Sequence, residues 1–412
     1  MNTDYLIYAL LIFAFLLFFL GAPLALWWWR QQRAEIPAAL TPPAELVQEP
    51  LFLSFHEPLP FNREQPDLEH QSPAWRGRML RAGQVMATMQ VRHVFFLHGT
   101  FVGSDPLDLL PPLRSVFPGF HQKIEVPLKA AMRGIVDRVA GDNGNFLPPY
   151  IRLFEAATGH QAHCRLLEWS SANHHIARLL GALHLIEFLL QQPGLETGQR
   201  VLLIGHSHAR QVFGLFTHLI GRSVSGEQLW SFLREQELAA PGIEESCRRL
   251  QNLGYDFVTM GGPVRYAWAF LPGMRALHLV NHRGDQLLAE KPLGFWQTAA
   301  GDYVQQWGTI GSDTLATTAR ERKLNRLLDP ILGKGTDTRL WFDAIVRRER
   351  LGNFGRTLLI DYGDQSRGRP NFLSTVFGHG IYTRYQCMLY QTQLICRYLY
   401  ENDIERSDGA WG

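Results

Sequence analysis

A buried strand followed by a sharp turn and a helix is the sequence feature that most constrains this chain. Residues 201–204 are four consecutive large apolar residues, and apolar residues return at helical spacing from Val212 to Ile220. A short apolar run without polar alternation is typical of a strand covered on both faces, as in a parallel sheet. The segment therefore predicts an α/β fold, with helices on both sides of a mostly parallel sheet.

The turn between that strand and that helix reads Gly205-His206-Ser207-His208-Ala209. Small residues two before and two after a serine let strand and helix approach closely, and the strained turn lifts the hydroxyl above the sheet. Ala209 stands where this pattern usually has glycine. We expect the two flanking histidines to serve as polar packing or pocket wall. The alternative is an ordinary strand-to-helix turn whose serine caps the helix.

Composition excludes several classes of function. The 412 residues suffice for one large or two ordinary domains, and 40 basic against 38 acidic residues give no electrostatic case for nucleic acid. The four cysteines form no Cys-x-x-Cys pair, so neither a zinc site nor a redox motif is indicated. Histidines between positions 160 and 175 lack the carboxylate spacing of a metal site. We expect no metal and no cofactor.

The N-terminal segment predicts a membrane anchor. Residues 5–29 contain no charged side chain, and as a helix at about 1.5 Å per residue they exceed the roughly 30 Å hydrocarbon core of a bilayer. Arg30 and Arg33 follow the run, whereas no basic residue precedes it. The positive-inside rule then places the remainder of the chain in the cytoplasm, as a single-pass membrane protein.

Three regions follow from this pattern. Residues 1–33 are the predicted transmembrane anchor with its flanks, and residues 34–50 contain four prolines and few large apolar side chains, which is typical of a semi-rigid tether. Residues 51–412 have the composition of a globular domain.

Strand candidates within the globular region locate the candidate chemistry. Six segments rich in apolar residues predict strands, at residues 91–97, 164–170, 201–204, 255–260, 276–281 and 357–362. Residues 173–191 predict a helix before the strand at 201. Functional groups of open parallel sheets gather at the carboxyl ends of the strands. Asp256, at the start of its strand, is therefore expected at the opposite edge.

The strand at 91–97 runs directly into His98-Gly99, about a hundred residues before Gly-His-Ser-His-Ala. This combination resembles the lipase and esterase branch of the α/β-hydrolase superfamily. The resemblance implies the α/β-hydrolase fold, with Ser207 as nucleophile. It also implies an oxyanion hole made by the backbone N–H groups of His208 and of Thr100 or Phe101.

The same resemblance implies the chain order serine, acid, histidine. Asp285 lies in a turn just after the strand at 276–281 and is the first choice for the acid. Asp302 and Asp313, each in a glycine-flanked turn, are the second choice, and Asp361 and Asp364 are further alternatives. Of the 16 histidines, His379 alone follows Asp285. His379 would then accept the serine proton, and the aspartate would orient the imidazole.

Two long insertions, residues 106–160 and 286–356, are predicted to shape the pocket. The second is rich in aromatic side chains, as a lid over an apolar acyl group would be, and the alternative is that these side chains extend the core. With the membrane anchor, these features favour a hydrolase acting on lipid or other long-acyl esters. Acyl transfer by the same triad and a non-catalytic scaffold that binds partners at the membrane are the alternatives, and the sequence identifies no protein partner.

Overall fold

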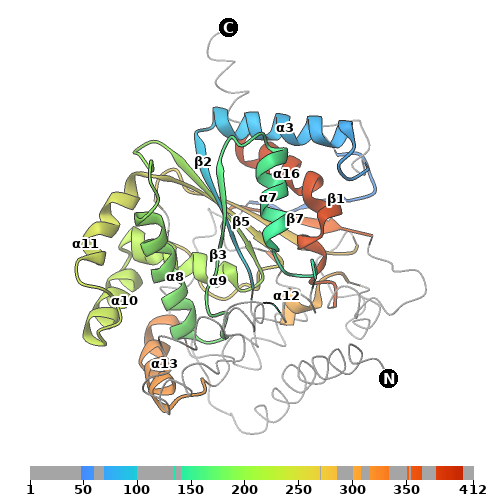
Figure 1. Cartoon of the computed structure of the whole chain (residues 1–412). Coiled ribbons are helices and arrows are strands. Elements are labelled where there is room, and N and C mark those ends of the chain that lie inside the picture. The colour runs from blue at the N-terminus through green and yellow to red at the C-terminus, as the bar shows by residue number, and fades with distance from the viewer. Residues whose placement is uncertain are drawn as a thin grey trace.

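A single parallel sheet forms the centre of the structure, a computed structural model of the chain (Figure 1). The structure describes residues 48–59, 69–99, 134, 141–269, 271–284, 300–307, 316–333, 350–351, 354–363 and 377–401. All strand pairs within the sheet are parallel. The predicted α/β fold with a mostly parallel sheet flanked by helices is therefore confirmed.

Within the described residues, seven strands lie in the order β1-β7-β6-β5-β4-β2-β3. Their bounds are β1 Leu51–Ser54, β2 Val91–Leu97, β3 His163–Leu167, β4 Arg200–His206, β5 Gly254–Met260, β6 Arg275–Asn281 and β7 Arg356–Asp361. Six of them coincide with the predicted strands to within a few residues. The short edge strand β1 was not predicted, because four residues carry too little periodicity to identify a strand.

Helices cover both faces of the sheet (Figure 1). On one face lie α8 His175–Leu190, α9 Ala209–Gly221, α10 Val224–Glu235, α11 Ile243–Cys247, η4 Arg248–Asn252 and α13 Ala319–Leu332. On the other lie α3 Pro73–Thr88, α7 Pro148–Ala157, α16 Met388–Ile395 and the π-helical η8 Cys396–Glu401. The short helices α12 Tyr303–Trp307, η6 Ile381–Thr383 and η7 Tyr385–Cys387 follow the carboxyl ends of strands.

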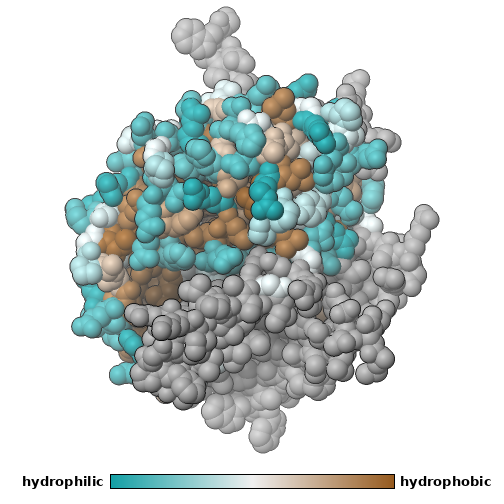
Figure 2. All heavy atoms as spheres, in the orientation of Figure 1, coloured by the Kyte–Doolittle hydropathy of each residue, from teal (hydrophilic) through white to brown (hydrophobic). Residues whose placement is uncertain are grey.

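The central strands are apolar on both faces because each face is covered by helices. In β4, Val201 and Leu203 pack into the core under α8 and α9, whereas Leu202 and Ile204 pack into the core under α3, α7 and α16. This alternation has the two-residue period of a strand. Figure 2 shows a largely hydrophilic described surface on the face drawn, with apolar side chains in a band across its middle.

The strand order places a topological switch point between β2 and β4. The chain leaves β2 toward β3 on one side and leaves β4 toward β5 on the other, while β2 and β4 are neighbours. Connections that diverge in this way open a crevice at the carboxyl ends of the two strands, where open α/β sheets bind ligands. His98-Gly99 and Ser207 follow these two strand ends.

The predicted anchor (1–33) and tether (34–50) lie almost wholly outside the described residues, as do most of the two predicted insertions. None of the described helices is both long and apolar enough to cross a bilayer. The transmembrane helix therefore stays a prediction.

Candidate active site

Ser207 occupies a strained turn between β4 and α9. Its φ is +54°, in the left-handed region that costs a non-glycine residue about 1–2 kcal/mol. Its N–H donates to the Met260 carbonyl at 2.8 Å, and its own carbonyl accepts from the Arg210 N–H at 3.2 Å. The turn is thus fixed at both ends, by the neighbouring strand β5 and by the first turn of α9.

Gly205 and Ala209 explain why this turn needs small residues. A Cβ on Gly205 would lie 2.8 Å from the Ala209 Cβ and 2.6 Å from the Phe213 ring, both too close for van der Waals contact. Strand and helix therefore touch here, and Ala209 is completely buried. Its methyl group fits because the facing position is glycine. The departure from glycine at position 209 is accommodated without loss of the close approach.

Gly99 brings the end of β2 against the serine. A Cβ on Gly99 would lie 2.5 Å from the Ser207 Cβ and 3.1 Å from Ser207 Oγ. The segment is held from the other side by Trp169, whose indole Nε1–H donates to the His98 carbonyl at 2.9 Å. Only glycine lets the chain pass this close to the hydroxyl.

We expect Gly99→Ala to lower the rate of any reaction at Ser207 by about 10²-fold, because displacing a reacting group by roughly 1 Å has an effect of this size. The rate of covalent labelling of Ser207 measures it. Gly77→Ala is the matched control: its added Cβ meets nothing within 4 Å. That change should leave the labelling rate unaltered and stabilise α3 by about 1 kcal/mol. Equal labelling rates for the two variants would show that the close approach of Gly99 does not affect the reactivity of Ser207.

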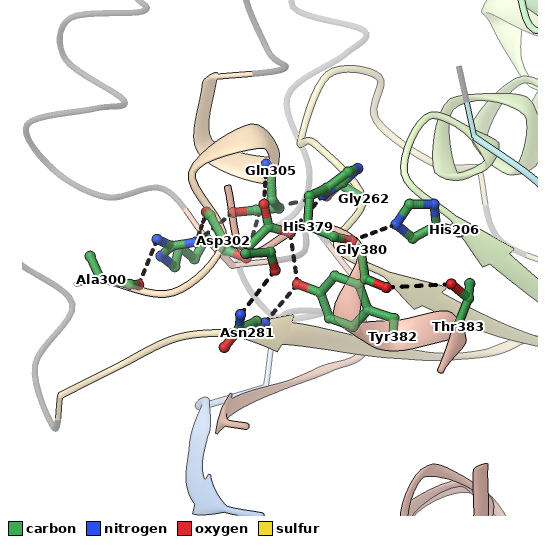
Figure 3. Close-up of polar contacts among 12 residues, drawn as sticks. His206, Gly262, Asn281, Ala300, Asp302, Gln305, His379, Gly380, Tyr382 and Thr383 are labelled. Atoms are coloured by element: carbon green, nitrogen blue, oxygen red, sulfur yellow. Dashed lines mark hydrogen bonds and ion pairs between the residues drawn. The ribbon is translucent and has the colours of Figure 1, made fainter. Parts of the chain in front are cut away.

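His379 and Asp302 form a hydrogen-bonded pair at the same edge of the sheet (Figure 3). His379 Nδ1 lies 2.8 Å from Asp302 Oδ2. Since a carboxylate only accepts, Nδ1 carries the proton and donates, and the neutral ring then has a bare Nε2. Asp302 is completely buried and His379 is 7% exposed. This is the geometry of an imidazole oriented by an acid.

Three donors surround the Asp302 carboxylate. Besides His379, the Tyr382 hydroxyl donates to Oδ2 at 2.7 Å and the Gln305 N–H donates to Oδ1 at 2.8 Å. Burial alone would raise the pKa of this carboxyl. The adjacent His379 and the hydrogen bonds outweigh that effect and hold the pKa of Asp302 below its ordinary value. Asp302 is therefore ionised at neutral pH.

The Asp302 turn is anchored to the carboxyl end of β6. The Asp302 N–H donates to the Asn281 carbonyl at 2.8 Å, and Gly301 forms an isolated antiparallel bridge with His282. The Arg350 guanidinium, also buried, donates to the Asp302 carbonyl at 2.6 Å. The chain thus leaves β6 and returns to its end before it reaches the acid.

His379 Nε2 is buried and has no hydrogen-bond partner within the described part of the chain. A buried acceptor without a partner is costly, so this nitrogen is available to a proton donor in the site. Ser207 is the residue after His206, whose ring lies against the His379 ring with centroids 4.5 Å apart.

The remaining predicted site residues divide into two groups. His208 is described and forms the N-cap of α9, directly after Ser207. Thr100 and Phe101, predicted as oxyanion-hole donors, lie outside the described residues, as do Asp285, the first choice for the acid, and Asp313. The structure therefore pairs His379 with Asp302, which was an alternative in the sequence analysis, and His206, the residue before Ser207, contacts His379. Asp256 lies near the start of β5, at the opposite edge, as predicted.

Two residues of the site were missed by sequence reasoning. Tyr382 follows His379 by three residues, and nothing in a lone tyrosine indicated that its hydroxyl would reach Asp302. Asn281 ends β6, donating through Nδ2 to the Gly378 carbonyl at 2.9 Å and accepting nothing at Oδ1 within the described structure. Its place at a strand end was the available signal.

Comparison of the chain with models of protein families, with curated proteins and with solved structures finds no match. The functional argument therefore depends on the geometry of the site.

Proposed function

We propose that the protein is a serine hydrolase of the α/β-hydrolase type that cleaves carboxylic esters through an acyl-enzyme. One observation carries the proposal: His379 donates from Nδ1 to a buried, ionised Asp302, and its Nε2 is left buried and unpartnered in a ring that lies against His206, the residue before Ser207. A bond from Nδ1 to a buried carboxylate together with a bare Nε2 is the arrangement of a general base that an acid orients. Nucleophile, orienting acid and base (Ser207, Asp302 and His379) also follow one another in the chain order that this class of enzyme uses.

The arrangement supports a two-step acyl transfer. Ser207 Oγ attacks the ester carbonyl carbon while its proton moves to His379 Nε2. The tetrahedral intermediate then collapses, the C–O bond to the alcohol breaks, and His379 returns the proton to the departing alkoxide. Water, deprotonated by the same nitrogen, attacks the acyl-enzyme and releases the carboxylic acid and Ser207. Asp302 stays ionised throughout and stabilises the imidazolium.

Negative charge on the carbonyl oxygen would develop at the N-terminus of α9. In this proposal the His208 N–H is one donor of the oxyanion hole, and the positive end of the helix dipole adds to it. The second donor would come from Thr100 or Phe101, after Gly99. The contact between Gly99 and Ser207 supports this part of the proposal, because it sets the chain after β2 beside the reacting hydroxyl.

The proposed substrates are lipid or other long-acyl esters. This part depends on the predicted membrane anchor at residues 1–33, which would hold the site near a bilayer. It is tested with p-nitrophenyl esters of graded chain length, presented to the full chain in detergent micelles. We expect the ratio kcat/KM to rise with acyl length, whereas a preference for acetate would contradict a lipid substrate.

Covalent labelling with a fluorophosphonate tests the proposed chemistry. The full chain should be labelled, and Ser207→Ala and His379→Ala should each abolish labelling because the serine is then absent or lacks its base. His184→Ala, at an exposed position of α8, is the control and should label like the parent. If the folded parent takes up no label, or if Ser207→Ala is labelled equally, the protein is not a serine hydrolase of this kind.

A further inference from the structure

His206 makes a close contact with the proposed general base that the mechanism above does not use. Its Nε2 lies 2.9 Å from the carbonyl oxygen of His379, and the two rings are 4.5 Å apart between centroids (Figure 3). A carbonyl only accepts, so Nε2 of His206 carries the proton and donates. His206 is 2% exposed. The residue before the nucleophile is therefore bonded to the backbone of the base.

Strand geometry explains why His206 faces this way. Along β4, Leu202 and Ile204 point toward the core under α3, α7 and α16, and His206 is the next residue with the same parity. Its ring also lies 5.8 Å from that of Tyr382, which belongs to the same core. The rigid strand β4 thus carries the nucleophile at its end and presents the His206 donor one residue earlier.

His206 stays neutral in this position. Burial, and then the neighbouring His379, lowers the pKa of His206 to about 3 despite its bond to the His379 carbonyl. A neutral ring does not compete with His379 for Asp302 and does not repel the imidazolium that forms during catalysis. Its contribution is a fixed donor.

The segment after His379 is also held by the loop at residues 144–145, and Gly144 lies beside the His206 ring as well. The Gly144 N–H donates to the Gly380 carbonyl at 3.1 Å, and the Asn145 N–H donates to Thr383 Oγ1 at 3.1 Å. These bonds hold the residues after the base but do not touch His379 itself. Among the described hydrogen bonds, the bond from His206 connects the His379 backbone to β4, the strand directly before Ser207.

We propose that His206 is a positioning residue: its Nε2–H fixes the His379 main chain relative to Ser207, so that Nε2 of His379 is set to receive the serine proton. The inference depends on the proposed function and adds a role for a residue beside the nucleophile. Asp302 orients the His379 ring through Nδ1, whereas His206 would set the position of the residue as a whole.

Two variants separate the donor of His206 from its ring. His206→Phe keeps a ring against His379 but removes the donor, whereas His206→Gln keeps an N–H donor at a similar reach. We expect His206→Phe to lower the limiting rate constant of fluorophosphonate labelling by about 10- to 100-fold with little change in the half-saturating concentration. His206→Gln should recover most of the rate. A purely structural role would reduce the fraction of protein that labels, not the rate of that fraction.

A second readout does not require activity. The Nδ1 proton between His379 and Asp302 should give a strongly downfield proton NMR signal in the full chain, absent in His379→Gln. We expect this signal to broaden in His206→Phe and to return in His206→Gln. Equal labelling rates and an unchanged signal in His206→Phe would overturn the positioning role while the parent still labels. A parent that does not label would instead contradict the proposed function, and the NMR signal alone would then decide whether His206 holds His379.

Discussion

Asp302→Asn is expected to lower the rate of labelling or ester cleavage by about 10⁴-fold. All three neighbours of the carboxylate are donors: His379 Nδ1–H and the Tyr382 hydroxyl at Oδ2, and the Gln305 N–H at Oδ1. In an asparagine, the NH₂ group must take the place of either Oδ1 or Oδ2. The Gln305 N–H is part of the backbone and cannot become an acceptor, so the NH₂ group faces His379.

His379 would then change tautomer. Its Nδ1 accepts from the asparagine, the proton moves to Nε2, and the nitrogen that must receive the Ser207 proton is blocked. Fold and substrate binding should remain, because asparagine has nearly the shape of aspartate. The measurement is the second-order labelling constant, with the fluorophosphonate-titratable fraction as the check on folding.

Asp285→Asn and Asp313→Asn are the matched controls, because each changes an acid that the sequence analysis also considered. Both should retain labelling within an order of magnitude of the parent. If Asp285→Asn loses labelling and Asp302→Asn keeps it, the Asp302–His379 bond is not the catalytic pair and the acid is Asp285.

The partner of His379 shows where sequence reasoning reaches its limit. Asp285 lies closest in sequence to the end of β6 and was preferred for that reason. The chain, however, returns to this strand end, where Gly301 bridges His282 and the Asp302 N–H bonds to the Asn281 carbonyl. Such a return is set by long-range packing, including the buried Arg350, and leaves no periodic signal near Asp302.

The strands and the serine turn were predictable because their signals are local. Residues 94–97 and 201–204 are apolar without interruption, and each run is buried under helices on both faces in the structure. The histidine was also accessible, since His379 alone follows the candidate acids Asp285 and Asp302. The position of His206 against His379 was not predicted. The alternation of side chains along β4 could have placed His206 on the same face as Leu202 and Ile204, which the segment after His379 covers.

Replacing Asp256 should have the other large effect, which is on the stability of the fold and not on the reaction. It lies in β5 near the amino end of the strand, is completely buried, and accepts from Arg200 Nε at 2.8 Å and from the Tyr400 hydroxyl at 3.0 Å. The Arg200 side chain is 12% exposed. Without the carboxylate, the largely buried Arg200 guanidinium has no counter-ion. We therefore expect Asp256→Ala to lower the free energy of unfolding by about 3–5 kcal/mol. Urea denaturation of the full chain in micelles measures it.

A double variant tests the cause of that loss. Arg200→Met combined with Asp256→Leu replaces the ion pair by apolar side chains and should recover most of the stability, because no charge is then left without its partner. A double variant as unstable as Asp256→Ala would mean that shape, not charge, sets the effect. The folded fraction of Asp256→Ala should label at the parental rate, because Asp256 lies near the amino end of β5 whereas Ser207 follows the carboxyl end of the neighbouring strand β4. Two buried aspartates thus have opposite expected phenotypes: loss of Asp302 removes activity and keeps the fold, and loss of Asp256 weakens the fold and keeps the activity.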